Sequence, residues 1–219
     1  MQTRGLLSEE MNKIRRELTL MSACVEEDLG KAITMLHSDG EELAKEVKEG
    51  GKKVDALQLK IEDMALVLIA TQQPVARDLR ELVTVFKITA NLERIGDFVI
   101  HLAKAAKKMS QRPPFRSVEH IEHMAGTGQE MLKAAFSAFL AQDAEAARKA
   151  AGMDDKIDED HKALTEEILS LMKKKPELVK AAARLLRLSG YMERMGDHIT
   201  NICEGVIYMT EGRHEELNH

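Results

Sequence analysis

The sequence LERIGD at positions 92–97 returns as MERMGD at positions 192–197. Each copy holds a glutamate and an aspartate four positions apart, with an arginine and a glycine between them. Two further features recur at nearly the same interval: Lys53-Val54-Asp55 matches Lys156-Ile157-Asp158, and Pro74 matches Pro176. Repetition at a nearly fixed period is typical of a duplicated structural unit, so the chain is predicted to contain the same unit twice.

Apolar residues on both sides of these motifs recur every three or four positions, which is the period of an amphipathic helix. The pattern predicts three helices in each half: about 7–36, 38–73 and 75–109 in the first, and about 117–141, 143–173 and 176–211 in the second. Gly50-Gly51 falls inside the second helix. We expect the helix to be loosened there, because glycine costs about 1 kcal/mol in a helix interior.

The composition supports helices and excludes several classes of protein. The 219-residue chain contains 3% aromatic residues, no tryptophan and four prolines. Its formal net charge of −5 argues against a nucleic-acid-binding protein, which usually presents a basic face. No apolar run approaches the roughly 20 residues that span a bilayer, and the N-terminus lacks the apolar core of a signal peptide, so a cytoplasmic location is predicted. Cys24 and Cys203 lack a CxxC spacing and are predicted to be small core residues.

One proline-rich stretch, Gln111-Arg112-Pro113-Pro114-Phe115, is predicted to separate two domains, residues 1–111 and 115–219. Three antiparallel helices joined by short turns form a bundle. We therefore expect an all-α fold made of two three-helix bundles in tandem, related by internal duplication. A single array of six helices is the alternative.

Each repeated motif places polar side chains on one face of its helix, because residues four apart lie on the same side. The first face carries Glu93, Asp97 and His101. The second carries Glu193, Asp197, Asn201 and Glu204. Carboxylates that converge in this way repel each other in the absence of a cation, and oxygen ligands suit Mg, Mn and iron, with zinc as a further option. A metal site in each repeat is one prediction.

An ordinary ion pair is the competing prediction, because Arg94 and Arg194 each stand three positions before the aspartate of their motif. Further metal ligands would come from a neighbouring helix, where Asp55 and Asp158 occupy equivalent places in the repeat. The alternative is that such an aspartate is a solvated turn or cap residue, as is usual beside a glycine-rich break. The acidic run 154–161 is otherwise expected to be mostly hydrated surface. The glycine inside each motif indicates either close approach of another backbone or of a bound ion's shell, or tight helix packing alone.

The segments QPVARDLRELVTVFKITANLERIGD (73–97), EGGKKVDALQLKIED (49–63) and YMERMGDHITNICEGVIYMTEG (191–212) closely resemble the PhoU family. The resemblance extends over nearly the whole chain and implies paired three-helix bundles, often dimeric. Some members bind iron or zinc through repeated E(D)xxxD motifs, which here match Glu93 with Asp97 and Glu193 with Asp197. The first repeat has His101 where the second has Asn201, so the two sites are expected to differ.

The resemblance also implies regulation rather than catalysis. Members of the family link the ATPase subunit of the phosphate ABC transporter (PstB-like) to a sensor histidine kinase (PhoR-like), and they repress the phosphate-starvation response. A di-metal enzyme of the ferritin-like kind is an alternative, but it would need E-x-x-H motifs on two helices, and the nearest matches at 158–161 and 211–214 do not supply that set. A metal-free structural scaffold is the third alternative.

Overall fold

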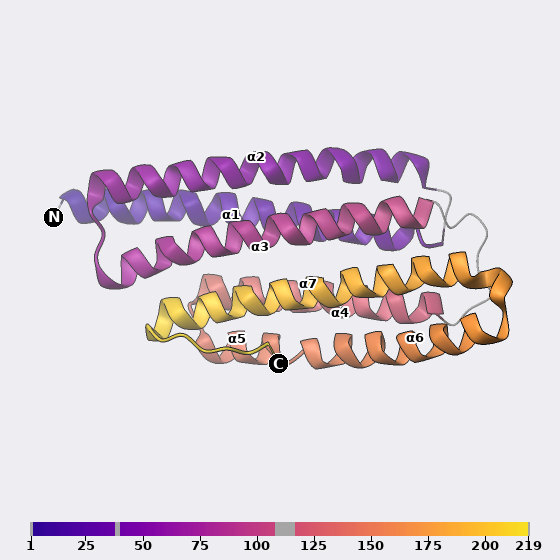
Figure 1. Ribbon diagram of the computed structural model, residues 1–219. Helices are drawn as coiled ribbons and strands as arrows, with labels where there is room; N and C mark the ends of the chain where they lie inside the picture. The colour runs from indigo at the N-terminus through magenta and orange to yellow at the C-terminus, as the bar shows by residue number, and fades with distance from the viewer. Residues whose placement is uncertain (1, 38–39, 108–116, 219) are drawn as a thin grey trace.

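The computed structural model describes residues 2–37, 40–107 and 117–218, and all regular secondary structure within them is helical. The first half contains α1 (Gln2–Thr34), α2 (Glu41–Gln72) and α3 (Ala76–Lys107). The second contains α4 (Ser117–Ala141), α5 (Ala144–Ala151), α6 (Asp154–Lys174), the 3-10 turn η1 (Pro176–Leu178) and α7 (Val179–Glu211). Figure 1 shows α1–α3 as one bundle and α4–α7 as a second bundle alongside it. The predicted all-α fold of two tandem bundles is confirmed.

The helix predicted over 143–173 is wrong in one respect, because two helices, α5 and α6, occupy that segment. The side chain of Asp143 caps α5 by accepting a hydrogen bond from the amide of Ala146 at 3.0 Å. Gly152 ends α5, and Asp154 and Asp155 form the first turn of α6, where negative charge stabilises the helix dipole. The periodic pattern hid this break because the apolar stripe continues in phase across it.

The expected loosening at Gly50-Gly51 is also wrong, since α2 runs unbroken from Glu41 to Gln72. Both glycines make room for side chains of neighbouring helices. A Cβ on Gly50 would lie 1.8 Å from Oδ2 of the buried Asp28 on α1, and a Cβ on Gly51 would lie 2.4 Å from Cδ1 of Ile100 on α3. The glycine pair therefore allows close packing inside the first bundle. The start predicted for this helix at residue 38 and the boundary predicted at 111–115 lie outside the described residues.

The apolar stripes pack together as a core along both bundles. Its fully buried side chains include Leu18, Ile61 and Leu92 in the first bundle and Phe139 and Met192 in the second. Cys24 and Cys203 are buried free cysteines, as predicted. None of the described helices combines the length and the apolar character that a membrane-spanning segment requires.

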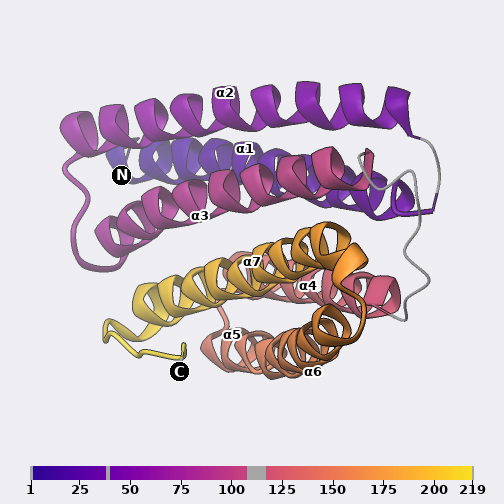
Figure 2. The same ribbon diagram turned by 45° about the vertical axis from the view of Figure 1, so that its right-hand side comes forward.

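The two bundles meet along α3 and α7, which run in opposite directions side by side (Figures 1 and 2). Contacts recur at seven-residue steps along this seam. Thr84 Oγ1 donates to the carbonyl oxygen of Gly205 at 3.2 Å, Asn91 Oδ1 lies 2.7 Å from His198 Nδ1, and the rings of Phe98 and Tyr191 stack at 5.9 Å. A seven-residue period is that of helices packed by knobs into holes, so the seam holds the bundles in a defined register.

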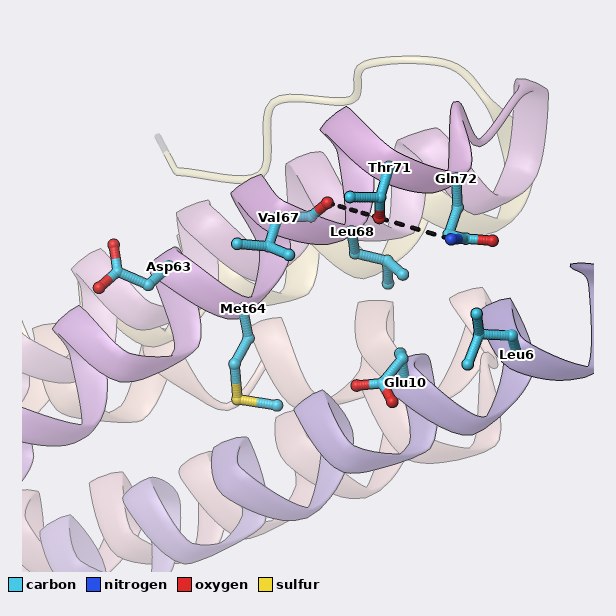
Figure 3. Close-up of a pocket in the computed structure, with 8 residues that line it drawn as sticks. All are labelled: Leu6, Glu10, Asp63, Met64, Val67, Leu68, Thr71 and Gln72. Carbon is cyan, nitrogen blue, oxygen red and sulfur yellow. Dashed lines mark hydrogen bonds between the residues drawn. The ribbon is translucent and has the colours of Figure 1, made fainter.

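A pocket of about 430 Å³ lies between α1 and α2, away from the repeated motifs. Figure 3 shows that Leu6 and Glu10 come from α1, and that Met64, Val67 and Leu68 come from α2. Its lining is mainly apolar and contains no pair of converging carboxylates. The acidic motifs therefore occupy a different part of the molecule.

Candidate functional site

The first acidic group comprises Glu93 and Asp97 on α3 together with Asp55 on α2. Glu93 and Asp97 are partly buried, whereas Asp55 is exposed. Burial raises the pKa of Glu93, and the negative charges of Asp97 and Asp55 raise it further, while Arg94 acts in the opposite direction. The fold thus brings Asp55 of α2, a predicted metal ligand, close enough to Glu93 of α3 for its negative charge to act on that carboxyl group.

The second acidic group is larger and more strongly coupled. Glu193 and Asp197 on α7 face Asp158 on α6. Burial raises the pKa of Glu193, with further increases from the charges of Asp197 and Asp158. Burial likewise raises the pKa of Asp158, and Asp197 adds to the effect. Mutual repulsion of this kind makes the group receptive to a cation.

Asp154, which was expected to lie on a hydrated surface, belongs to the second acidic group. Its Oδ2 accepts a hydrogen bond from Thr200 Oγ1 at 3.3 Å. Its Oδ1 is inaccessible to solvent and has no hydrogen-bond partner among the described residues. Burial raises the pKa of Asp154 to about 7, and the charges of Asp158 and Asp197 contribute to the increase. One signal in the sequence pointed to it, since Asp154 precedes Asp158 by one helical turn.

His161 also adjoins the second group and was not predicted as a ligand. Its positive form lowers the pKa of both Glu193 and Asp158. Its Nδ1 lies 3.1 Å from Ser189 Oγ, which itself donates to the carbonyl oxygen of Leu186 at 3.0 Å. Because the Ser189 proton is used in that bond, Nδ1–H of His161 is the donor to Ser189, and Nε2 keeps its lone pair whenever the imidazole is neutral.

The two motif glycines have different roles although their sequences match. A Cβ on Gly196 would lie 1.9 Å from Asp154 Oδ1, so the glycine lets the carboxylate rest on the backbone of α7. A Cβ on Gly96 would lie 3.6 Å from Val54 Cγ1, which is an ordinary contact. Neither glycine makes room for another backbone: Gly196 accommodates the Asp154 side chain, and Gly96 makes only ordinary packing contacts.

At one pair of facing positions, the two repeats carry their larger and smaller side chains on opposite helices. In the first repeat Gly51 on α2 faces Ile100 on α3. In the second, Asp154 occupies the position of Gly51, and the smaller, polar Thr200 occupies that of Ile100. The first repeat fills this space with an aliphatic side chain and the second with a hydrogen-bonded carboxylate. The two acidic groups therefore differ in charge as well as in the His101 and Asn201 positions.

The substitutions Gly96→Ala and Gly196→Ala are expected to change stability in opposite directions. Alanine at 96 should raise the free energy of unfolding by up to about 1 kcal/mol through helix propensity. Alanine at 196 should lower it by about 1 kcal/mol, because displacing Asp154 costs more than the propensity gained. Urea unfolding at pH 7 measures both.

The double variant Gly196→Ala with Asp154→Ala supplies the control for this pair. Once the carboxylate is removed, alanine at 196 should stabilise the protein as alanine at 96 does. An equal response of the two glycine positions in the presence of Asp154 would contradict the packing described above.

Three other predicted residues make specific contacts. The ring of His101 stacks on Tyr191 of α7 at 5.0 Å, and its nitrogens have no hydrogen-bond partner among the described residues. Asn201 Oδ1 accepts a hydrogen bond from Asn218 Nδ2 at 3.4 Å, and Glu204 Oε1 accepts one from the amide of Leu217 at 2.8 Å. The end of the described chain thus returns along α7 (Figure 1), and Asn201 and Glu204 bind it in this structure.

The competing ion pairs do not form between the described residues. Arg94 Nε lies 3.8 Å from Glu93 Oε2, its side chain is 62% exposed, and no ion pair joins Arg94 to Asp97 or Arg194 to Asp197. A single exposed contact of this length contributes little. Within residues 2–37, 40–107 and 117–218, no three His, Cys, Asp or Glu side chains already enclose a point suited to a metal ion. The carboxylates form an open acidic face rather than a closed cage.

Comparison with known proteins identifies the same duplication. The PhoU domain model matches residues 18–106 and again residues 121–206. The "Phosphate-specific transport system accessory protein PhoU homolog" of Clostridium acetobutylicum is 30% identical over 99% of this chain and 99% of its own length. Its homologue from Caulobacter vibrioides is 33% identical over 95% of this chain and 90% of its own. The Escherichia coli K12 protein is 30% identical over 95% of this chain and 87% of its own.

Solved structures agree with these sequence relatives. The crystal structure of PhoU from Pseudomonas aeruginosa superposes with a TM-score of 0.89 at 28% identity, covering 94% of this chain and 99% of that one. The phosphate transport system regulatory protein PhoU from Streptococcus pneumoniae gives the same TM-score and identity over 96% and 99%. With a matching domain in each half and relatives that match nearly its whole length, the chain belongs to the PhoU domain family.

Proposed function

We propose that this protein is an accessory protein of phosphate transport that restrains phosphate uptake and the phosphate-starvation response. The observation that carries the proposal is the match to named phosphate transport accessory proteins over both repeats. In this role it acts as a cytoplasmic adaptor, working as a homodimer. It couples the ATPase subunit of the phosphate ABC transporter to a sensor histidine kinase, and it reaches the membrane only through these partners.

Each acidic group is proposed to bind a metal ion, with iron or zinc as the expected metals and Mg or Mn as further options. In the first repeat the ligands are Glu93 and Asp97, with Asp55 from α2 and His101 as additional donors. The raised pKa of Glu93 supports this assignment, because the charges that raise it are those a cation would neutralise. The open face leaves room for water to complete the coordination shell.

The second repeat offers a stronger ligand set. Glu193, Asp197 and Asn201 come from α7, Asp158 and Asp154 from α6, and Glu204 lies one turn beyond. The residues fit a cation because Asp154 Oδ1 is buried without a hydrogen-bond partner among the described residues and because burial raises the pKa of three of these carboxylates. His161 can supply Nε2, since its contact with Ser189 orients the ring, as a hydrogen bond at the other ring nitrogen orients metal-binding histidines. A bound cation would supply positive charge that joins α6 to α7.

Deletion of the gene tests the regulatory role. In phosphate-rich medium the deletion strain is expected to express phosphate-scavenging genes at the level that the parent strain shows only in starvation. Transcript measurement in both media, with the intact gene restored as a control, distinguishes loss of repression from slow growth. Unchanged expression in rich medium would count decisively against the proposal.

Affinity purification tests the adaptor role separately. Tagged protein, crosslinked in phosphate-rich cells, is expected to retain the transporter ATPase and the kinase, each identified by mass spectrometry. The same tag on an unrelated helical protein is the control. Recovery of neither partner would refute the proposed coupling of the transporter ATPase to the kinase. Any derepression in the deletion strain would then have another cause.

A further inference from the structure

A pocket of about 280 Å³ lies where α3 ends and α7 begins, at the end of the seam between the two bundles. We call it the basic pocket. Its polar lining consists of His101 and Lys104 from α3 and Arg184, Arg187 and Tyr191 from α7. Both bundles therefore contribute cationic groups to one hollow.

The positive charges of the basic pocket have no acidic partner among the residues that the structure describes. No acidic side chain lines the pocket, and within the described part of the chain Lys104, Arg184 and Arg187 form no ion pair. Other basic residues of this protein form ion pairs with carboxylates: Arg15 lies 2.6 Å from Glu81, and Arg148 lies 2.9 Å from Glu215. Unpaired cations that converge on a hollow, in a chain of net charge −5, favour an anionic ligand.

The walls of the pocket are ordered by packing. Tyr191 stacks against His101 at 5.0 Å and against Phe98 at 5.9 Å, and Leu188 beside it is fully buried. Aromatic and aliphatic walls lower the local dielectric constant, which strengthens the attraction between a bound anion and the cations around it. The volume suits a small ligand, being just below the range of about 300–1,000 Å³ typical for drug-sized molecules.

Further basic side chains surround the pocket and extend its region of positive potential. Residues 173–187 contain six basic side chains and one acidic side chain, Glu177. These residues form the end of α6, η1 and the first part of α7. Figures 1 and 2 show them at the same end of the molecule as the last turns of α3. A field of this kind draws anions toward the pocket and speeds their association.

We propose that the basic pocket binds a phosphate group. Two guanidinium groups and an ammonium group match the several oxygens of a phosphate dianion, which arginine binds through paired hydrogen bonds. The preference for an oxyanion follows from the pocket, whereas the choice of phosphate among oxyanions rests on the proposed function. Because the ligand would join α3 to α7, its binding would tighten the contact between the two bundles.

Calorimetric titration of metal-free protein with inorganic phosphate, at ionic strength held constant with potassium chloride, tests the proposal. We expect saturable binding, and at least about tenfold weaker binding in the Arg184→Ala, Arg187→Ala double variant, because each lost charge-assisted hydrogen bond contributes about 1.4 kcal/mol or more. Both arginines are exposed and unpaired, so the variant should fold normally. Circular dichroism checks this.

The control variant is Lys45→Ala, Lys52→Ala, which removes the same charge from exposed residues of α2 that pair with Glu42 and Glu49. It should bind phosphate as the parent does. Equal weakening in both variants would show that net charge alone attracts the anion and would overturn the proposal.

A second arm distinguishes free phosphate from a lipid headgroup. Phosphatidylglycerol vesicles that float with the parent protein but not with the arginine variant would assign the phosphate group to a lipid. Binding in neither arm refutes the proposal. Of the proposed metal ligands only His101 lines this pocket, and the arginine variant leaves all of them in place. Derepression in the deletion strain and metal content can therefore be observed while phosphate binding fails, and the two failures remain distinguishable.

Discussion

In metal-free protein, Asp154→Asn is expected to raise the free energy of unfolding by about 2 kcal/mol at pH 8 and to leave it nearly unchanged at pH 4. The pKa of Asp154 is raised from 3.8 to about 7 in the folded protein, with burial as the largest cause. At pH 8 the folded protein therefore holds a carboxylate that is largely removed from water, whereas asparagine of the same shape carries no charge.

The sign follows from proton binding. Because the folded pKa lies above the unfolded value, the folded form binds more protons than the unfolded form between about pH 4 and pH 7. The contribution of Asp154 to stability is thus fully present below pH 4 and is lost as the pH rises through 7. A shift of this size corresponds to about 4 kcal/mol at 1.36 kcal/mol per unit, and partial contact with solvent reduces the expected value to about 2 kcal/mol.

Urea unfolding of both proteins from pH 4 to pH 8 in the presence of a chelator measures the difference. Asp155→Asn is the matched control, since Asp155 lies in the same first turn of α6 but is exposed. It loses the same interaction with the helix dipole without relieving a buried charge. If the two variants followed the same pH dependence, burial of Asp154 would not be the cause.

The largest effect is expected on metal binding. The variant Glu193→Gln, Asp197→Asn should lower the affinity of the second site by more than about 100-fold, because losing even an outer-shell partner costs about 10- to 100-fold. Asp154→Asn should weaken the same site while it stabilises the metal-free protein. Opposite effects of one substitution on metal-free stability and on metal affinity are expected of a ligand and not of a structural residue.

Elemental analysis of protein purified without chelator, followed by competition with a metal-sensitive dye, provides the measurement. Glu93→Gln, Asp97→Asn is the companion variant in the first repeat. We expect it to remove less metal, because the first group lacks counterparts of Asp154 and His161. Negligible metal in the parent protein and in both variants would refute the metal sites.

Much of the fold was predictable because helix periodicity is a local property. Three- and four-residue spacing located the ends of α4, and prolines located the starts of α3 and η1. The break at Gly152 was missed because an apolar stripe that stays in phase conceals a short interruption. The Gly50-Gly51 pair was misinterpreted because its cost in an isolated helix is offset by the close approach of Asp28 and Ile100.

The acidic faces were predictable in part, and their metal ligands stay predictions. The four-residue spacing placed Glu93 with Asp97 and Glu193 with Asp197, since both members of each pair lie on one helix. The one-turn spacing to Asp158 was the only sequence signal for Asp154, and it does not show that Asp154 is partly buried while its acidic neighbour Asp155 is exposed. That difference arises from the packing of α6 on α7, which brings Asp154 against Gly196.

The sequence by itself determined that this chain is helical, duplicated and acidic on two equivalent faces, because each property depends on the spacing of residues along the chain. Tertiary structure alone decided which faces meet. It buried Asp154 against Gly196, left the equivalent space in the first repeat to Ile100, and joined cations of α3 and α7 in one pocket. These outcomes depend on packing between helices that are far apart in sequence, and the spacing of residues within one helix does not determine that packing.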